Sequence, residues 1–353
     1  RDEDRYAEQP FYACILDEAQ AIKNHTTQKY KAVCQVRSQV RFALTGTPVE
    51  NRLGELWSIF SFLMPGYLPP YKNFCARFEK PIVQEEDANA VRRLNQLTGP
   101  FILRRMKADV LRELPPKTEN VHRIELDTEQ RKLYLAAVVD AREKLRAAKP
   151  EDKMAVFAVL MRLRQICCDP RLVADNWSGG SAKLDACMEL VTAAVEGGHR
   201  ILLFSQFTSM LELLAKRLDA EGISHFTLQG STPKPVRAEL VRRFNGGEVS
   251  VFLISLRAGG TGLNLTAADI VIHYDPWWNV AAQNQATDRA YRIGQQNPVQ
   301  VYKLIAQDTI EEKIVELQQA KQSLADTVTG TADGAILSMR PDELLQLLEG
   351  SEP

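Results

Sequence analysis

The sequence predicts an α/β fold in which helices cover parallel β-sheets. Short, continuously apolar runs recur along the chain, and helical patterns lie between them. Runs of this kind are typical of strands buried on both faces, which is the environment of strands in a parallel sheet. The length of 353 residues suggests about two domains, each large enough to bury a core.

The first apolar runs predict strands at 11–16 and 41–44, with a helical segment between them. Amphipathic patterns then predict a helix over 50–64 and further helices within 128–168. The segments expected to be irregular are 68–77, 81–87 and a linker at 174–181.

The second half of the chain predicts a larger sheet. A helix that begins near 207 is expected to end before Gly222, because glycine is common just beyond helix C-termini. Another helix is expected from Pro233 to Gly246. The predicted strands are 201–204, 225–228, 251–254, 270–273 and 299–302.

Two helices are expected after the last of these strands. Asp308 and Glu311 resemble a capping box that opens a helix running toward Ser323. The tail after 326 is weakly specified, apart from one short amphipathic helix at 342–348.

Composition excludes several classes of protein. Lys and Arg total 44 and Asp and Glu total 45, a net charge of −1, which excludes a disordered polyelectrolyte and a globally basic coat for nucleic acid. A local basic groove stays possible. No apolar run reaches the roughly 18 residues of a membrane-spanning helix. The six cysteines have neither CxxC nor zinc-finger spacing, which favours reduced thiols.

An acidic pair directly follows the first predicted strand. Ligands of parallel α/β sheets lie beyond the carboxyl ends of strands, so Asp17 and Glu18 are candidates for a nucleotide site. One carboxylate can hold Mg²⁺ through its water shell, and the other can orient or deprotonate the attacking water. The alternative is structural: Asp17 caps a helix over 19–24, and Glu18 lies in its first turn.

Two further turns follow predicted strands. The hydroxyl groups of Thr45 and Thr47, on either side of Gly46, can hydrogen-bond across a cleft, or the segment is a simple strand-ending turn. The segment 255–264 has three glycines within four residues, which lets a backbone approach a phosphate closely. It lacks the Lys-Ser/Thr pair of a P-loop, and the pattern GxxxxGK[ST] occurs nowhere in the chain.

The segment 285–295 carries two arginines at helical spacing. On a helix, Gln285, Arg289 and Arg292 would share one face. Two guanidinium groups on one face can clamp nucleotide phosphates and stabilise transferring charge as arginine fingers. The alternative is a solvated helix with an ion pair between Asp288 and Arg292, which accounts for Arg292 only.

Aromatic and basic residues give weaker signals for nucleic acid. Trp277 and Trp278 follow the predicted strand 270–273, where they can stack on bases or pack inside the domain. Basic residues form two groups that can line a groove for a phosphate backbone or form solvated faces. The groups are Arg92, Arg93, Arg104, Arg105 and Lys107, and Arg162, Arg164 and Arg171.

The order of these motifs is more specific than any one of them. Asp-Glu-Ala-Gln, Leu-Thr-Gly-Thr-Pro, Phe-Ser-Gln-Phe, the glycine-rich segment and Gln-Ala-Thr-Asp-Arg-Ala-Tyr-Arg-Ile-Gly-Gln follow one another. In this order they resemble the Swi/Snf family of helicase-like, DNA-dependent ATPases in helicase superfamily two. Phe-Ile-Leu-Arg-Arg-Met-Lys, followed by Leu-Pro-Pro-Lys, is also similar to this family, so the resemblance covers nearly the whole chain.

The resemblance implies two RecA-like lobes, with ATP in the cleft between them and double-stranded DNA across both. Helical insertions would lie between the lobes, and the first lobe would be incomplete. The implied boundaries are 1–49 for the C-terminal part of the first lobe, 50–180 for the insertions, 181–325 for the second lobe and 326–353 for a tail.

The resemblance also implies roles for individual residues. Asp17 would bind Mg²⁺ through water, Glu18 would activate the attacking water, and Arg289 and Arg292 would act as fingers on ATP. The other implied contacts are with the nucleotide for Gln285 and Gly262, between the lobes for Thr45, Gly46 and Thr47, and with DNA for Ser205, Gln206, Arg257, Gly260, Thr261 and Trp278.

The activity implied is an ATPase motor that translocates on duplex DNA and remodels nucleoprotein complexes. The family's phosphate-binding loop is missing and the first residue is not Met, so we expect an N-terminally truncated piece that hydrolyses ATP poorly alone. Two alternatives stay open. One is a non-catalytic module that binds DNA or protein, and the other is an RNA helicase of the same superfamily, which the segment 104–107 and the long insertions disfavour.

The insertions are compact and the tail around 339–345 is similar to bacterial members of the family. We therefore expect a bacterial protein of the cytoplasm or nucleoid, or a nuclear one if the source is eukaryotic. We expect a monomer with no membrane partner.

Overall fold

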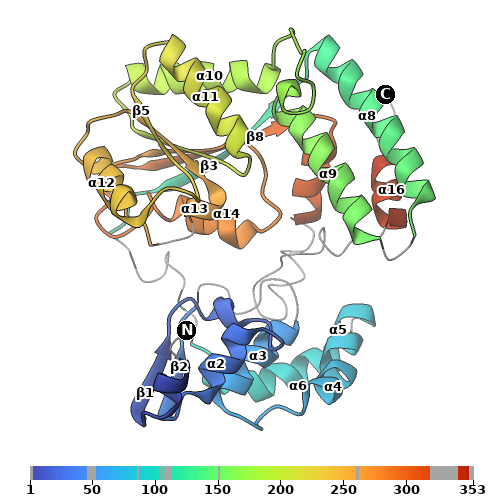
Figure 1. Ribbon diagram of the computed structural model, residues 1–353, viewed down its shortest axis with the longest axis vertical. Coiled ribbons are helices and arrows are strands. Elements are labelled where there is room, and N and C mark those ends of the chain that lie inside the picture. The colour runs from blue at the N-terminus through green and yellow to red at the C-terminus, as the bar shows by residue number, and fades with distance from the viewer. Residues whose placement is uncertain are drawn as a thin grey trace. The chain divides into compact units, whose positions relative to one another are not determined.

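The chain divides into two compact units, one formed by 1–110 with 318–335 and the other by 111–317 with 336–353. Each unit contains a parallel β-sheet with helices packed on it (Figure 1), so the predicted α/β class is confirmed. The computed structural model describes residues 3–45, 53–85, 87–103, 105, 111, 113–149, 152–259, 262–318 and 341–349.

The sheet of the first unit has two strands. β1 (Phe11–Leu16) pairs in parallel with β2 (Ser38–Ala43), with Ile15 opposite Phe42. Arg41 of β2 donates through Nη1 to the carbonyl of Phe62, at 2.7 Å, which ties the strand to the following helix. Ile15 and Phe42 lie on the other face and are 60% and 52% exposed. Within the described residues this face is therefore apolar and largely uncovered.

The other elements described in the first unit are helices. Phe60, Phe74, Phe78 and Leu94 are buried together in its core. The expectation that 68–77 and 81–87 are irregular was wrong for 71–77 and 81–84, which are helical, because burial of Phe74 and Phe78 outweighs the weak local pattern. Residues 68–70, 85 and 87 are irregular, as expected. The elements are α1 (Glu3–Ala7), η1 (Ala19–Ile22), α2 (Gln28–Gln35), α3 (Leu53–Leu63), α4 (Tyr71–Phe74), the π-helical η2 (Cys75–Glu79), α5 (Lys80–Gln84), α6 (Ala88–Thr98) and η3 (Gly99–Phe101).

The second unit has a six-stranded, fully parallel sheet in the order β3-β8-β7-β4-β6-β5. All five strands predicted in this region are present. The strands are β3 (Lys117–Ile124), β4 (Ile201–Ser205), β5 (His225–Leu228), β6 (Val251–Ser255), β7 (Ile270–His273) and β8 (Val299–Ala306).

β3 was not predicted. Its sequence is polar and most of its residues are exposed, as suits the edge of a sheet, and it forms by pairing along its whole length with β8. The second unit therefore begins well before the implied boundary at 181, and the helices within 128–168 pack in it.

Helices cover both faces of this sheet. α10 (Ala182–Glu196) and α11 (Thr208–Ala220) pack on the face that carries Leu203 and Leu253, as Figure 1 illustrates. The opposite face carries Leu202 and Phe252. The predicted end of α11 is confirmed, because Gly222 follows it with a φ of +68° that favours glycine. Covering the second face are α12 (Lys234–Asn245), α13 (Leu256–Gly259) and α14 (Val280–Thr287).

A third core lies among the helices beside the sheet. α8 (Thr128–Ala147), α9 (Lys153–Cys168) and α16 (Pro341–Glu349) contact one another and bury Tyr134, Leu160 and Leu344. The predicted tail helix is thus present as α16, and residues 310–318 form the helix expected after β8. η4 (Pro170–Leu172) follows α9. No described helix has the length and apolar character needed to cross a membrane.

Candidate functional site

The acidic pair lies at the carboxyl end of β1, and both side chains are exposed. Glu18 has φ 51° and ψ 51°, a left-handed conformation that costs energy for a residue with a side chain. Asp17 Oδ1 accepts a hydrogen bond from Glu18 N at 2.9 Å. The capping alternative fails here, since η1 is a single 3₁₀ turn that begins at Ala19, and the capping position, Glu18, has no side-chain cap hydrogen bond.

Gln20 connects the acidic pair to the turn that follows β2. Its Nε2 donates to Glu18 Oε2 at 2.5 Å, and its Oε1 accepts from Thr45 Oγ1 at 2.7 Å. Backbone bonds join the same two segments, from Ala19 N to Leu44 O at 2.9 Å. A single amide therefore orients Glu18 and Thr45 together.

Sequence reasoning did not select Gln20 as a site residue, although its place in the Asp-Glu-Ala-Gln motif was a usable signal. Gly46 and Thr47 lie outside the described residues.

Asp17 fits a magnesium ion held mainly by water and phosphate oxygens. It is exposed, and its recorded hydrogen bond uses only Oδ1. Mg²⁺ is commonly held by one or two carboxylates while it keeps several waters. Nowhere in the described part of the chain do three or more His, Cys, Asp or Glu side chains gather as a metal cage.

In the second unit, polar side chains meet at the carboxyl ends of β4 and β6. Ser205 is fully buried and donates to Asp275 Oδ1 at 2.6 Å, so its hydroxyl points to Asp275 and not outward. Gln206 N donates to the same oxygen at 3.2 Å. Gln206 Nε2 and Ser255 Oγ are buried and have no hydrogen-bond partner among the described residues.

Ser255 was missed by the sequence analysis, although it pairs in register with Ser205 on the neighbouring strand. In the glycine-rich segment that follows it, Gly262 has a φ of +44°. Gly260, Thr261 and the side chain of Arg257 lie outside the described residues.

The arginines of 285–295 are not on one helix face, contrary to the prediction. α14 ends at Thr287, so Arg289 and Arg292 lie in the turns that follow it. The side chain of Gln295 donates to the carbonyls of Ala268 and Ala290, at 2.7 and 3.1 Å, and thereby holds these turns. Arg289 is 7% exposed, whereas Arg292 is exposed. Gln285 lies within α14 and is partly buried.

The end of α14 is attached to β7 by a buried histidine. Nε2 of His273 lies 2.8 Å from Thr287 Oγ1, whose own proton goes to the carbonyl of Gln283 at 3.3 Å. Nε2 therefore carries the proton, and the buried Nδ1 has no partner among the described residues. Burial lowers the pKa of His273 to about 3, with a smaller contribution from the positive charge of Lys303.

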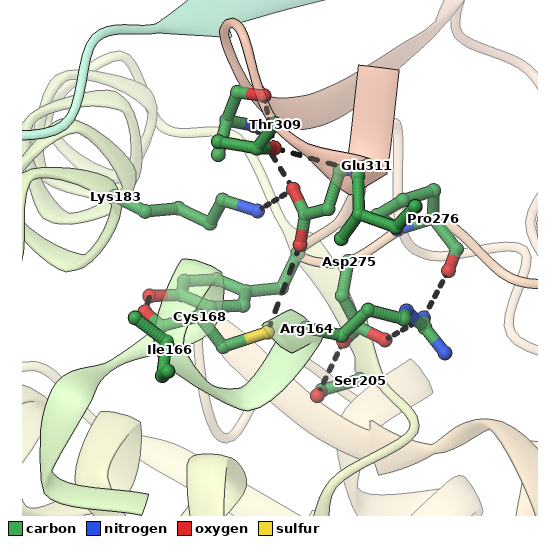
Figure 2. A network of polar contacts seen from close by, with 12 residues as sticks. Arg164, Ile166, Cys168, Lys183, Ser205, Asp275, Pro276, Thr309 and Glu311 are labelled. Atoms are coloured by element: carbon green, nitrogen blue, oxygen red, sulfur yellow. Dashed lines mark hydrogen bonds and ion pairs between the residues drawn. The ribbon is translucent and has the colours of Figure 1, made fainter. Parts of the chain in front are cut away.

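Two buried ion pairs lie beneath the ends of the strands (Figure 2): Arg164 with Asp275, and Lys183 with Glu311. All four side chains are fully buried. The suggestion that Arg164 lines a phosphate groove is therefore wrong, because it has no exposed surface.

Trp278 is only 7% exposed, and the guanidinium of Arg164 lies 4.3 Å from its ring centroid. This burial favours the packing alternative for Trp278. The described cysteines are free thiols, and burial raises the pKa of Cys187 to about 12.

Comparison with known proteins agrees with these motifs. A family model described as the SNF2-related domain matches residues 1–172, and one described as the helicase conserved C-terminal domain matches 182–294. An uncharacterized ATP-dependent helicase of Mycoplasma pneumoniae is 39% identical over 97% of this chain and 33% of its own length. The chain thus spans about a third of the length of such curated relatives.

This chain covers a larger share of two solved structures. The Sulfolobus solfataricus SWI2/SNF2 ATPase core in complex with dsDNA is 35% identical, with a TM-score of 0.54 over 92% of this chain and 71% of that one. A second structure, of the Sulfolobus solfataricus SWI2/SNF2 ATPase core domain, is 36% identical, with a TM-score of 0.57 over 98% of this chain and 72% of that one. The chain therefore belongs to the SNF2 (Swi/Snf) family of helicase-related ATPases.

Proposed function

We propose that the protein containing this chain is an ATP-dependent motor that translocates on double-stranded DNA and remodels protein–DNA complexes. The observation that carries the proposal is the bridge in which Gln20 holds Glu18 and Thr45 at the carboxyl ends of two adjacent parallel strands. This is where an α/β sheet binds its ligand, and a fixed carboxylate there can activate a water. The relative solved with duplex DNA supports the choice of substrate.

In this proposal the candidate residues have separate roles. Asp17 binds Mg²⁺ of ATP through water, and Glu18 orients the attacking water. Arg292 is exposed and available to a phosphate, while Arg289, being buried, needs a local rearrangement to reach one. The remaining proposed contacts are Gln285 and Gly262 with the nucleotide, Thr45, Gly46 and Thr47 in coupling of the lobes, and Gln206, Arg257, Gly260 and Thr261 with DNA. Ser205 and Trp278 are buried and would support the DNA-binding surface from inside the unit.

The test is ATP hydrolysis with and without duplex DNA. It is run on this chain and on a longer chain that includes a phosphate-binding loop, each also as Glu18→Gln and as the matched control Glu85→Gln, an exposed carboxylate in the same unit. We expect turnover only in the longer chain, stimulated by duplex DNA, lost in Glu18→Gln and kept in Glu85→Gln. Turnover by the short chain at the same rate contradicts the expectation that it hydrolyses ATP poorly on its own.

Two other outcomes favour the alternatives. A longer chain that binds DNA or protein without DNA-stimulated turnover is an interaction module. Stimulation by RNA and not by duplex DNA indicates an RNA helicase.

A further inference from the structure

The loop that follows β7 is held by one helix, α9. Tyr274 donates through its hydroxyl to the carbonyl of Cys168 at 2.9 Å. Arg164, one turn earlier on α9, donates through Nη2 to Asp275 Oδ2 at 3.3 Å and to the carbonyl of Pro276. Three consecutive residues of the loop are therefore attached to the same helix, as Figure 2 shows for the contacts of Arg164.

Asp275 connects the loop after β7 to the turn after β4. Its Oδ1, the oxygen that does not face Arg164, accepts from Ser205 Oγ at 2.6 Å and Gln206 N at 3.2 Å. Ser205 Oγ in turn accepts from Phe207 N at 3.2 Å. The backbone of the turn from 205 to 207 is thus fixed by one carboxylate, whose other oxygen faces a guanidinium from outside the sheet.

Arg164 is a costly residue at this position. It is fully buried, yet its Nε and Nη1 have no hydrogen-bond partner among the described residues. Aromatic rings surround it instead, with centroids 4.3 Å away for Trp278 and 5.7 Å for Phe207. An apolar side chain of similar length would fill this space without the desolvation of a charge. What it could not supply is the directed bonds to Asp275 and Pro276.

We propose that Arg164 is a positioning residue for DNA binding: through Asp275 it sets the geometry of the turn at Ser205 and Gln206 from α9. The inference rests on the proposed function, because that function assigns this turn to DNA. It adds that α9 influences how the second unit holds DNA. A shift of α9 would change the geometry of the turn at Ser205 and Gln206 without any contact between α9 and the nucleic acid.

The test compares four variants of the longer chain, of which Arg164→Lys is the conservative one. Arg164→Met removes the directed bonds but leaves the carboxyl group of Asp275 buried without its cation. Arg164→Met with Asp275→Asn removes the unpaired carboxyl group as well, while the amide keeps an oxygen for Ser205 and Gln206. Leu145→Ala, a buried truncation in the last turn of α8, is the control for lost stability alone.

We expect Arg164→Met to raise the duplex DNA concentration for half-maximal ATPase stimulation about tenfold, with a smaller change in kcat at saturating DNA. The double variant should regain thermal stability but keep the weakened response to DNA. Leu145→Ala should lose stability and keep the parent's response to DNA. Arg164→Lys should have a half-maximal DNA concentration between those of the parent and Arg164→Met. An unchanged half-maximal concentration in Arg164→Met and the double variant would overturn the positioning role while leaving the motor intact.

A second measurement separates this proposal from the proposed function. Hydrogen exchange of the amides at 205–208 reports the order of the turn whether or not the protein is an ATPase. Faster exchange there in the double variant than in Leu145→Ala supports positioning by Arg164. Equal exchange in the two refutes it, even when the parent protein shows no DNA-stimulated turnover.

Discussion

The buried His273 makes the second unit sensitive to mild acid. Its protonated Nε2 already donates to Thr287, so a second proton must go to Nδ1, which is buried without an acceptor among the described residues. The pKa is about 3 in the folded protein, because of burial first and the charge of Lys303 second, against an ordinary 6.5. Since the unfolded chain takes up the proton first, stability is full above about pH 6.5 and falls as the pH drops toward 3.

The size of the effect follows from linkage. Between about pH 7.5 and about pH 5 the unfolded histidine becomes almost fully charged while His273 in the fold does not, which costs about 2 kcal/mol. For a unit of this size that lowers Tm by roughly 4–8 °C. The loss depends little on the folded pKa, provided that it stays well below 5.

The assay is thermal unfolding of the parent, His273→Gln and His122→Gln at both pH values. A glutamine at 273 can still donate to Thr287 but cannot titrate, and His122 is an exposed histidine on β3 in the same unit. We expect His273→Gln to lose less stability on acidification than the parent by about 2 kcal/mol, and His122→Gln to follow the parent. Equal losses in the parent and His273→Gln would refute the reasoning.

Three further predictions concern other polar contacts. Lys183→Met should lower the free energy of unfolding, measured with denaturant, by about 3–5 kcal/mol because it leaves Glu311 buried without its partner. Adding Glu311→Gln should recover most of this loss, and losses that simply add would contradict the pairing. Burial raises the pKa of Glu119, but bonds from two lysines lower it to about 2. The stabilisation is present above about pH 4.5 and lost toward pH 2, so Glu119→Gln should flatten the acid unfolding curve, and superimposable curves would count against it. Gln20→Ala should slow DNA-stimulated ATP turnover about tenfold or more, because Glu18 would lose the bond that holds it in place to orient the attacking water. The exposed Gln28→Ala should not slow it, and equal rates in the two variants would exclude the bridge from the mechanism.

Local patterns were sufficient wherever one segment carries its own signal. The strand at 270–273 is a run of apolar residues that is buried on both faces, and its bounds were predicted without error. Gly222 ends α11 because its positive φ suits glycine, a property that belongs to the residue itself. Asp17 and Glu18 were found because a carboxylate pair directly after an apolar, strand-forming run is visible in the sequence.

Features that depend on a distant partner were missed. β3 has a polar sequence and becomes a strand only because β8, more than 170 residues later, offers an edge to pair with. The turn containing Arg289 and Arg292 has helical spacing, but the side chain of Gln295 fixes it outside the helix.

Arg164 is the sharpest case of the difference between sequence and tertiary structure. In the sequence it is one basic residue of a group, and its charge suggests a surface that faces phosphate. The sequence by itself determined the family, the order of the motifs along the chain and the acidic pair, because each is a local chemical pattern. Only the tertiary structure decided that Arg164 is buried against Asp275 and Trp278, since the burial of a charge depends on which partners the fold brings to it.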